Sequence, residues 1–324
     1  MADRESESER DLTEDTASAT VFPTCVVSAL CPKILEDTVS VLQAAGIEAS
    51  VTAAYSCCGQ PAYSAGKRPE ASRLASSALD QLSKTSNPIV VPSGSCAAMI
   101  KKVWPRLFER TPRYEKAVLL AQRTFELTQF LEAKGFSPAL AEGSKGLSPA
   151  PAEDGKTGSE GPSSGTHSSV PKKVTVHDSC HGARGLGIGP QCRSLLKVAG
   201  YQISECEDPG FCCGFGGVFS ATLPEVSVAI GRAKVEMLRR ASYAVVGTDP
   251  ACLIHLATVG AGAVNDKLRA GTSPAEAGSM RFYHIAELLA AAIAGRELPE
   301  PSLGVSSGKH YPRPESHPYE IGSR

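Results

Sequence analysis

The sequence lacks the features that would indicate a membrane or nucleic-acid role. Its longest apolar run is far shorter than the roughly 20 residues needed to span a bilayer. Basic residues are not in excess, because the formal net charge is -1 and the pI is near 6.7. The first residues are acidic and polar, without the charged-then-apolar order of a secretory signal. We therefore expect a cytoplasmic protein with no membrane span and no nucleic-acid partner.

Two common redox motifs are also missing. The sequence has no ferredoxin-type C-x2-C-x2-C-x3-C run and no G-x-G-x-x-G dinucleotide fingerprint. The nearest match to that fingerprint, GLGIGP at 185–190, has Pro190 where the third glycine belongs. Nothing in the sequence points to bound flavin. The chain is therefore not expected to take a hydride from a substrate by itself.

Cysteine, in contrast, is abundant and regularly placed. In a cytosolic chain, grouped cysteines indicate metal or redox chemistry more often than disulfides. Eight of the eleven cysteines form two matching sets: Cys25, Cys57, Cys58 and Cys96, then Cys180, Cys212, Cys213 and Cys252. The sets are offset by 155 residues at three positions and by 156 at the last, where VVGTDPAC is one residue longer than VVPSGSC. The chain therefore contains an internal duplication.

Composition divides the chain into two blocks. Residues 1–19 are charged, 141–172 are rich in Gly, Ser and Pro, and 300–324 show no periodicity. We predict a disordered tail, a flexible linker and a second disordered tail for these segments. The remaining blocks, 20–140 and 173–299, are predicted to be two domains of similar size.

Both blocks alternate β-rich and amphipathic segments. Strands are predicted over 20–25, 47–56, 87–92, 173–180, 201–208 and 243–247. Helices are predicted over 33–46, 69–84 and 123–135 in the first block, and over 192–200, 224–240 and 281–295 in the second. This alternation predicts an α/β fold of two pseudo-twofold-related, Rossmann-like subdomains, each a short parallel sheet covered by helices. Each matched cysteine follows a predicted strand, so we expect two converging sets of four.

Four thiolates suit either zinc or an iron–sulfur cluster. Structural zinc usually uses C-x2–4-C pairs, which are absent, whereas adjacent cysteines can reach different metal atoms. The glycine after each pair lets the backbone approach, so that N–H groups can bond to sulfur. An iron–sulfur centre is favoured, with zinc at one or both sites, disulfides, and inert buried thiols as the alternatives.

The doubled CCG pattern resembles the cysteine-rich CCG domain found in heterodisulfide reductase, in the iron–sulfur subunit of glycolate oxidase and in lactate-utilisation proteins. The short lactate-utilisation protein A family is most similar, through CCGQPAYSAG, PSGSC, FELTQFL, DSCHGARGLG, CCGFGGVFS and HIAEL. The resemblance covers nearly the whole chain outside the tails and linker.

This resemblance implies an oxidoreductase component that carries one or two iron–sulfur clusters of the [4Fe-4S] class. It implies work with two partner proteins, one of them an iron–sulfur protein, in oxidising L-lactate to pyruvate, and inactivity without them. The implied metal ligands are the eight matched cysteines: Cys25, Cys57, Cys58, Cys96, Cys180, Cys212, Cys213 and Cys252. Alternatives are a disulfide reductase like heterodisulfide reductase, a glycolate oxidase-like subunit, and a structural zinc scaffold.

The chain departs from the family pattern at one position in each repeat. The full CCG pattern ends in C-x-x-C, but Ser93 and Asp249 stand where the first of those cysteines belongs. Each repeat therefore offers four cysteines rather than five. A conventional four-thiolate cluster and an unconventional fifth ligand fit equally well. Asp249 can supply an oxygen ligand or cap the helix that follows it.

Other polar residues near the matched cysteines are weaker candidates. His177 and His181 flank Cys180, where each can hydrogen-bond to a metal ligand, relay a proton, or simply cap or face solvent. His255 lies one helical turn after Cys252, and Arg184 can offset the negative charge of a cluster or bind a carboxylate. Three cysteines have no mate in the duplication and are expected to serve packing: Cys31, Cys192 and Cys206.

Overall fold

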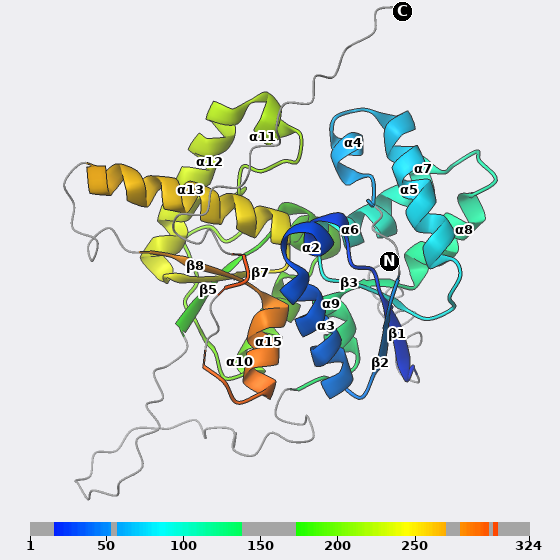
Figure 1. The fold of residues 1–324 in the computed structure, drawn as a ribbon, viewed down its shortest axis with the longest axis horizontal. Helices are drawn as coiled ribbons and strands as arrows, with labels where there is room; N and C mark the ends of the chain where they lie inside the picture. Colours follow the sequence, from blue (N-terminus) through cyan, green and yellow to red (C-terminus); the bar gives the residue numbers. More distant parts are fainter. Residues whose placement is uncertain (1–15, 53–56, 138–172, 270–278, 298–300, 304–324) are drawn as a thin grey trace, which may run out of the picture.

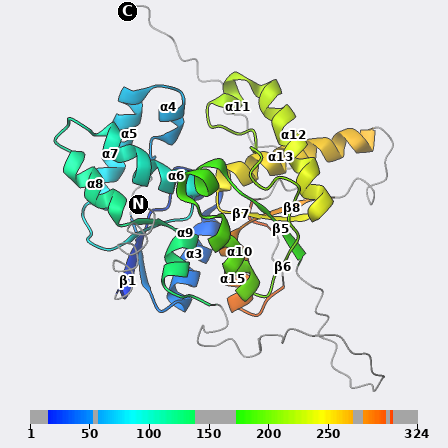
Figure 2. The same cartoon turned by 180° about the vertical axis from the view of Figure 1, so that it is seen from behind.

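The computed structural model describes residues 16–52, 57–137, 173–269, 279–297 and 301–303, which form two α/β halves (Figures 1 and 2). The first half contains β1 (Ser18–Val21), α2 (Cys25–Leu30), α3 (Pro32–Ala44), β2 (Glu48–Val51), α4 (Gln60–Ser64), α5 (Arg68–Leu82), β3 (Ile89–Val91), α6 (Gly94–Ala98), the π-helix η1 (Met99–Val103), α7 (Trp104–Leu107), α8 (Tyr114–Gln122), β4 (Thr124–Glu126) and α9 (Leu127–Ala133). The second half contains β5 (Lys173–His177), the π-helix η3 (Cys180–Leu186), α10 (Gly189–Val198), β6 (Gln202–Ile203), α11 (Phe219–Thr222), α12 (Pro224–Ala241), β7 (Ala244–Gly247), α13 (Pro250–Arg269), β8 (Arg281–His284) and α15 (Ile285–Ile293).

Each half is built on a four-stranded parallel sheet, and the two sheets have the same topology. The strand orders are β2-β1-β3-β4 and β6-β5-β7-β8, with every pair parallel. The duplication in the sequence is therefore a duplication of the fold, which confirms the predicted pair of α/β subdomains. In both sheets the winding direction changes between the first and third strands in chain order. Ligands of open α/β sheets bind at the carboxyl ends of strands at such a point.

The two halves pack through equivalent helices. The first long helix of one half lies against the last helix of the other, so α3 contacts α15 and α10 contacts α9 (Figures 1 and 2). Side chains from both sheets meet in one buried cluster that includes Val21, Val90, Val176, Val246 and Tyr283. Helix α3 of the first half is equivalent to α10 of the second, and α9 is equivalent to α15. Swapping the halves therefore turns one helix pair into the other, so an approximate two-fold axis relates them.

The cysteine-bearing elements also meet across this axis. Helix α6 lies against η3, and α2 contacts α13. The Gly94 N–H donates to the Thr248 carbonyl at 3.0 Å. A Cβ on Gly94 would lie 3.2 Å from the Gly182 Cα, so the two backbones are nearly in contact there. The carboxyl edges of the two sheets are therefore held together.

The long helices match their predictions. The segments predicted over 33–46, 69–84, 192–200 and 224–240 form α3, α5, α10 and α12. Gly46 and Gly200 follow α3 and α10 with φ of +76° and +81°, the left-handed conformation that favours glycine after a helix. Pro69 and Pro224 lie in the first turns of α5 and α12.

The sequence analysis predicted a single helix for the closing segment of each block, and this prediction is wrong. A buried strand comes first, β4 before α9 and β8 before α15. Short apolar runs of this kind do not reveal their period, so their strand character is hidden in the sequence. The junctions do carry a signal, because Glu126 and His284 each form a capping box with the residue three positions later.

Regular structure extends slightly beyond the predicted domain edges. Strand β1 begins at Ser18, inside the predicted tail, and Leu303 is buried with the core of the second half. The predicted linker 141–172 and most of both predicted tails lie outside the described residues. Within the described parts of the chain, no helix is both long and apolar enough to cross a membrane.

The glycine of the second CCG motif should be structurally irreplaceable. Gly214 has φ of +88°, and a Cβ there would lie 2.4 Å from the Ser227 carbonyl oxygen. Gly46 has φ of +76° with nothing within 4 Å of its Cβ position, so Gly46→Ala carries only the backbone cost of about 1–2 kcal/mol. We expect Gly214→Ala to lower the free energy of unfolding by roughly 1 kcal/mol or more beyond Gly46→Ala in urea titrations. Equal losses in the two variants would contradict this account.

Candidate metal centres

The matched cysteines lie on loops and helix starts that follow the first three strands of each sheet. In the first half, Cys25 begins α2 just after β1, and Cys96 lies in α6 just after β3. Cys57 and Cys58 precede α4 in the connection that leaves β2. Since parallel strands present their carboxyl ends at one edge, the sheet brings all four side chains to the same place.

The first set forms a continuous chain of thiols. Cys57 lies close enough to Cys25 and to Cys58 for each neighbouring thiol to change its pKa. The Cys58 Sγ then donates to the Cys96 Sγ at 3.1 Å, well beyond the disulfide bond length of about 2.05 Å. Cys58 and Cys96 are buried, whereas Cys25 and Cys57 are half-buried. The four thiols that the repeat singled out are thus brought together with one side open to solvent.

The thiols of this chain ionise unequally. Hydrogen bonds from Cys25 and Cys58 lower the pKa of Cys57 to about 3 despite partial burial. The same bonds, together with burial, raise the pKa of Cys25 and of Cys58 well above the usual value. The protein therefore stabilises one thiolate with its neighbours' protons, and a bound metal ion would take the place of those protons.

The second set is arranged similarly around a more open edge. Cys213 lies close enough to Cys212 and to Cys252 for both thiols to affect its pKa. Cys213 and Cys252 are buried, Cys180 is half-buried and Cys212 is exposed. The pKa of Cys252 is lowered by Cys213 but raised overall by burial and by the charge of Asp249. Cys180 also lies near enough to Cys252 for its charge to raise this pKa. The structure therefore also gathers the second set, with Cys180 at its rim.

An imidazole adjoins this second set. A ring nitrogen of His177 and the sulfurs of Cys213 and Cys252 all lie within 4.8 Å of one another. His177 ends β5 and is buried, and burial lowers its pKa to about 3, so the ring is neutral. Of the two histidines that flank Cys180 in the sequence, His177 points into the site.

The other flanking histidine interacts with the rim of the site. His181 is exposed, and its Nδ1 lies 3.5 Å from the Cys180 Sγ. That hydrogen bond raises the pKa of His181. Arg184 is also exposed. Cys213 and burial raise the pKa of Cys212, and the positive charge of Arg184 lowers it in part. Both residues lie where they can offset negative charge on the cysteines.

Both CCG motifs direct backbone N–H groups at sulfur, as the glycines predicted. The Gly59 N–H donates to the Cys57 Sγ at 3.4 Å, and the Gly214 N–H donates to the Cys212 Sγ at 3.3 Å. Such bonds stabilise negative charge on the thiolates and tune a bound centre.

Residues without a repeat signal hold the CCG loops in place. The indole of Trp104, which is fully buried, donates to the Cys58 carbonyl at 2.9 Å. In the second half the Ser227 hydroxyl donates to the Gly214 carbonyl at 2.8 Å, and His255 lies 3.4 Å from that hydroxyl. His255 therefore supports the loop rather than lining the sulfur set. Sequence reasoning missed Trp104, whose only signal is that it is the single tryptophan.

The two positions that lack the family's extra cysteine have structural roles here. Ser93 caps its own helix α6, with its hydroxyl accepting from the Cys96 N–H at 3.5 Å. Asp249 caps a helix as well, but a helix of the other half, because its Oδ2 accepts from the Ser95 N–H at 2.7 Å. Asp249 therefore has a partner in the other half that the sequence analysis did not predict. The sequence could not show this because the contact spans the two halves.

The unmatched cysteines lie in packed surroundings. Cys31, Cys192 and Cys206 are all buried, and Cys192 lies in the cluster shared by the halves. Burial raises the pKa of Cys31 to about 12, and burial also raises the pKa of Cys192. Cys206 accepts from the buried ammonium of Lys234 at 3.6 Å. All eleven cysteines are free of disulfides.

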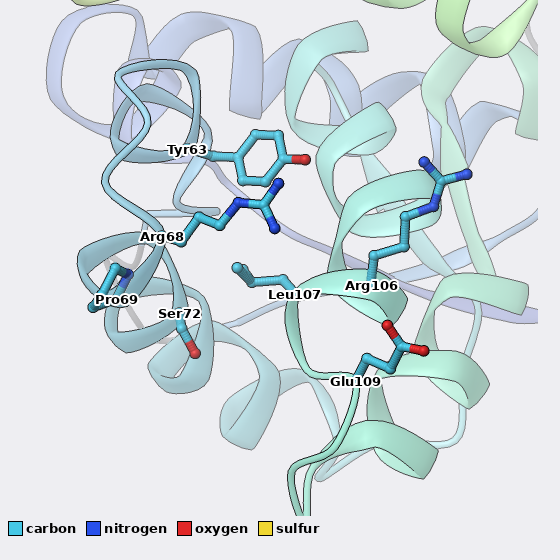
Figure 3. Close-up of a pocket in the computed structure, with 7 residues that line it drawn as sticks. All are labelled: Tyr63, Arg68, Pro69, Ser72, Arg106, Leu107 and Glu109. Carbon is cyan, nitrogen blue, oxygen red and sulfur yellow. The ribbon is translucent and has the colours of Figure 1, made fainter.

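A polar pocket of about 490 Å³ opens beside the first CCG motif (Figure 3). It lies between α4–α5 and α7, with Arg68 and Arg106 among the lining residues. The Arg68 guanidinium lies 5.8 Å from the centre of the Tyr63 ring. No cysteine lines the pocket, so it is separate from the thiol set, and its charged lining residues, Arg68, Arg106 and Glu109, are of both signs.

The unequal ionisation of the CCG cysteines predicts their reactivity in the reduced, metal-free protein. At about pH 5.5, Cys57 should already be a thiolate, whereas Cys212, whose pKa is raised, should stay protonated. We expect iodoacetamide to label Cys57 faster than Cys212 by roughly tenfold or more, measured by peptide mass spectrometry. The unfolded protein is the control, in which the two should react alike. Faster labelling of the more exposed Cys212 would contradict the assignment.

Comparisons with known proteins agree with the duplicated site. The family model of the CCG cysteine-rich domain matches the chain twice, over residues 19–101 and 174–257. Lactate utilization protein A 2 of Bacillus cereus (strain AH820) is 30% identical over 276 residues, which is 83% of this chain and 96% of that protein. Lactate utilization protein A 1 of Bacillus mycoides (strain KBAB4) is 32% identical over 240 residues, 73% of this chain and 86% of that protein. The chain therefore belongs to the cysteine-rich CCG domain family and carries two copies of that domain.

Proposed function

We propose that this protein is an iron–sulfur electron-transfer component of a multi-protein system that oxidises L-lactate to pyruvate. The observation that carries the proposal is the convergence of four thiols at the carboxyl edge of each duplicated sheet. The similarity to lactate utilization proteins A over most of the chain supplies the substrate class. Neither the metal nor the reaction follows from the fold alone.

The residues suit a cluster better than a single zinc ion. Cys57 and Cys58 are adjacent; the Cys58 thiol donates to Cys96, and Cys25 and Cys57 affect each other's pKa. Adjacent ligands of this kind suit a centre with several metal atoms, while structural zinc favours spaced pairs. The first centre would be held by Cys25, Cys57, Cys58 and Cys96, and the second by Cys180, Cys212, Cys213 and Cys252. A bound cluster would supply one-electron transfer.

The protein's own groups would set the environment of these centres. Cys58 and Cys96 are 1% and 8% exposed, which keeps water from the inner side of the first set. Backbone N–H groups of Gly59 and Gly214 would stabilise negative charge on sulfur. Burial and the number of such hydrogen bonds are the main means by which a protein adjusts a cluster's reduction potential.

Electron balance requires partners. Oxidation of lactate to pyruvate releases two electrons and two protons, and a cluster of this class accepts one electron at a time. The sequence has no dinucleotide fingerprint, so the group that first accepts the hydride would lie on another protein. We propose two partner proteins, one of them an iron–sulfur protein, with this chain passing electrons between them and inactive alone.

A second candidate function is reduction of a low-molecular-weight disulfide. It is favoured by one observation, the low pKa of Cys57 beside the Cys25 and Cys58 thiols, which keeps Cys57 in the thiolate form that attacks disulfides. Reduction of such a disulfide by the isolated protein with an artificial electron donor would select this function over the first.

The proposal predicts the metal content of the protein. Anaerobically purified or reconstituted protein should be brown and contain iron and acid-labile sulfide in equal amounts. Cys96→Ser should remove one centre's iron, about half of the total, because Cys96 joins the inner end of the first thiol chain. Cys192→Ala, which removes a buried thiol outside both sets, is the matched control and should keep its iron. A colourless protein that holds only zinc would refute the proposal.

The lactate assignment has its own test in cells. Deleting the gene should abolish growth on L-lactate as sole carbon source while growth on glucose continues. The wild-type gene should restore growth, and Cys57→Ser should fail to do so at equal protein abundance, because it breaks the centre of the first thiol chain. Normal growth of the deletion strain on lactate would remove lactate as the substrate.

A further inference from the structure

A buried histidine beside the second cysteine set has no hydrogen-bond partner within the described residues. His177 is 2% exposed, and neither of its ring nitrogens makes a hydrogen bond. Burying a polar group without a partner is unfavourable, so each such group calls for an explanation, such as a bound ion. The ring therefore lacks an interaction that the functional protein should provide.

The missing partner is indicated by where the ring lies. One ring nitrogen and the sulfurs of Cys213 and Cys252 lie within 4.8 Å of one another. This spacing allows one metal centre to touch all three atoms, because metal–nitrogen and metal–sulfur bonds are about 2.0 Å and 2.3 Å long. The buried cation whose charge acts on His177, Lys234, already donates to the carbonyls of Asp208 and Pro209 at 2.6 and 2.9 Å.

The first half lacks this nitrogen. Phe22 stands 155 residues before His177, and Phe22 is buried in the cluster that contains Cys58 and Cys96. The surroundings differ in a second way, which appears when α5 is aligned with α12. The buried positions of the two helices correspond one for one. In that register Lys234 takes the place of Ala78. The second half has thus gained an imidazole and a buried ammonium where the first half has only apolar side chains.

We propose that His177 is a fifth, nitrogen ligand of the centre held by Cys180, Cys212, Cys213 and Cys252, and that the two halves therefore hold chemically different centres. This inference rests on the proposed metal-binding function. It explains the second half's lack of a fifth cysteine, because Asp249 at that position is engaged with Ser95. The imidazole adds a neutral donor to four thiolates, so the two centres have equal ligand charge and differ in the nitrogen ligand of the second.

Pulsed EPR of the anaerobically reduced, full-length protein tests this inference. One of its two cluster signals should show a directly coordinated imidazole nitrogen, and growth on 15N-labelled histidine should change that coupling without any mutation. His181→Asn, which alters the exposed neighbouring ring, is the control and should keep the coupling. Wild-type clusters without any nitrogen coupling would overturn the proposal, even if iron and sulfide are present in full.

Two exchanged variants make the test specific. His177→Phe gives the second set the residue of the first, and should abolish the nitrogen coupling and shift the midpoint potential of that signal alone. Phe22→His makes the reverse change and should leave the second signal as it is. Retained coupling in His177→Phe would overturn the proposal. If His177→Phe does not fold, the labelled wild-type protein still decides.

A protein that takes up only zinc would refute the iron–sulfur function but still allow a decision on His177. Cobalt(II) would then be substituted for zinc, and its visible absorption distinguishes an all-sulfur site from a mixed sulfur–nitrogen site. A shift of the cobalt bands in His177→Phe, with no shift in His181→Asn, is the expected result. Unchanged bands would show that His177 is not a ligand.

Discussion

Thiolates that lie within a few ångströms of one another repel, and the scaffold around each cysteine set has to overcome that repulsion. The parallel sheets do so by bringing loops from three strands to one edge. Hydrogen bonds between the thiols, and N–H groups from Gly59 and Gly214, then spread the charge. Contacts between the halves fix this edge, since α6 meets η3 where Gly94 approaches Gly182. A metal cation bound here would replace the thiol protons, and its positive charge would offset the repulsion between the thiolates.

The two copies keep the same skeleton but differ around the sulfurs. In the first half, Trp104 holds the CCG loop and Phe22 and Ala78 make the surroundings apolar. In the second half, His177 and Lys234 bring polar groups into the same places. Cys212 is also exposed, whereas Cys57 is half-buried. The duplicated cysteine sets therefore lie in chemically different surroundings.

Much of the fold and of the site was predictable because the repeat is expressed in local signals. Cysteine spacing, the glycines after α3 and α10, and the prolines of α5 and α12 are all features of short segments. The strands β4 and β8 were missed because a three- or four-residue buried run has no readable period. The cross-half cap at Asp249 and the orientation of His177 depend on packing between distant segments, which spacing along one chain does not encode.

The central claim is that the duplicated thiol sets hold two iron–sulfur centres. Mössbauer spectroscopy of the anaerobically reconstituted, iron-57-enriched wild-type protein tests it most directly, because every iron atom contributes to the spectrum. The account predicts two cluster components of equal area with different parameters, and no other iron species. A spectrum containing only isolated iron ions, or a protein that excludes iron and binds zinc at both sets, would contradict it.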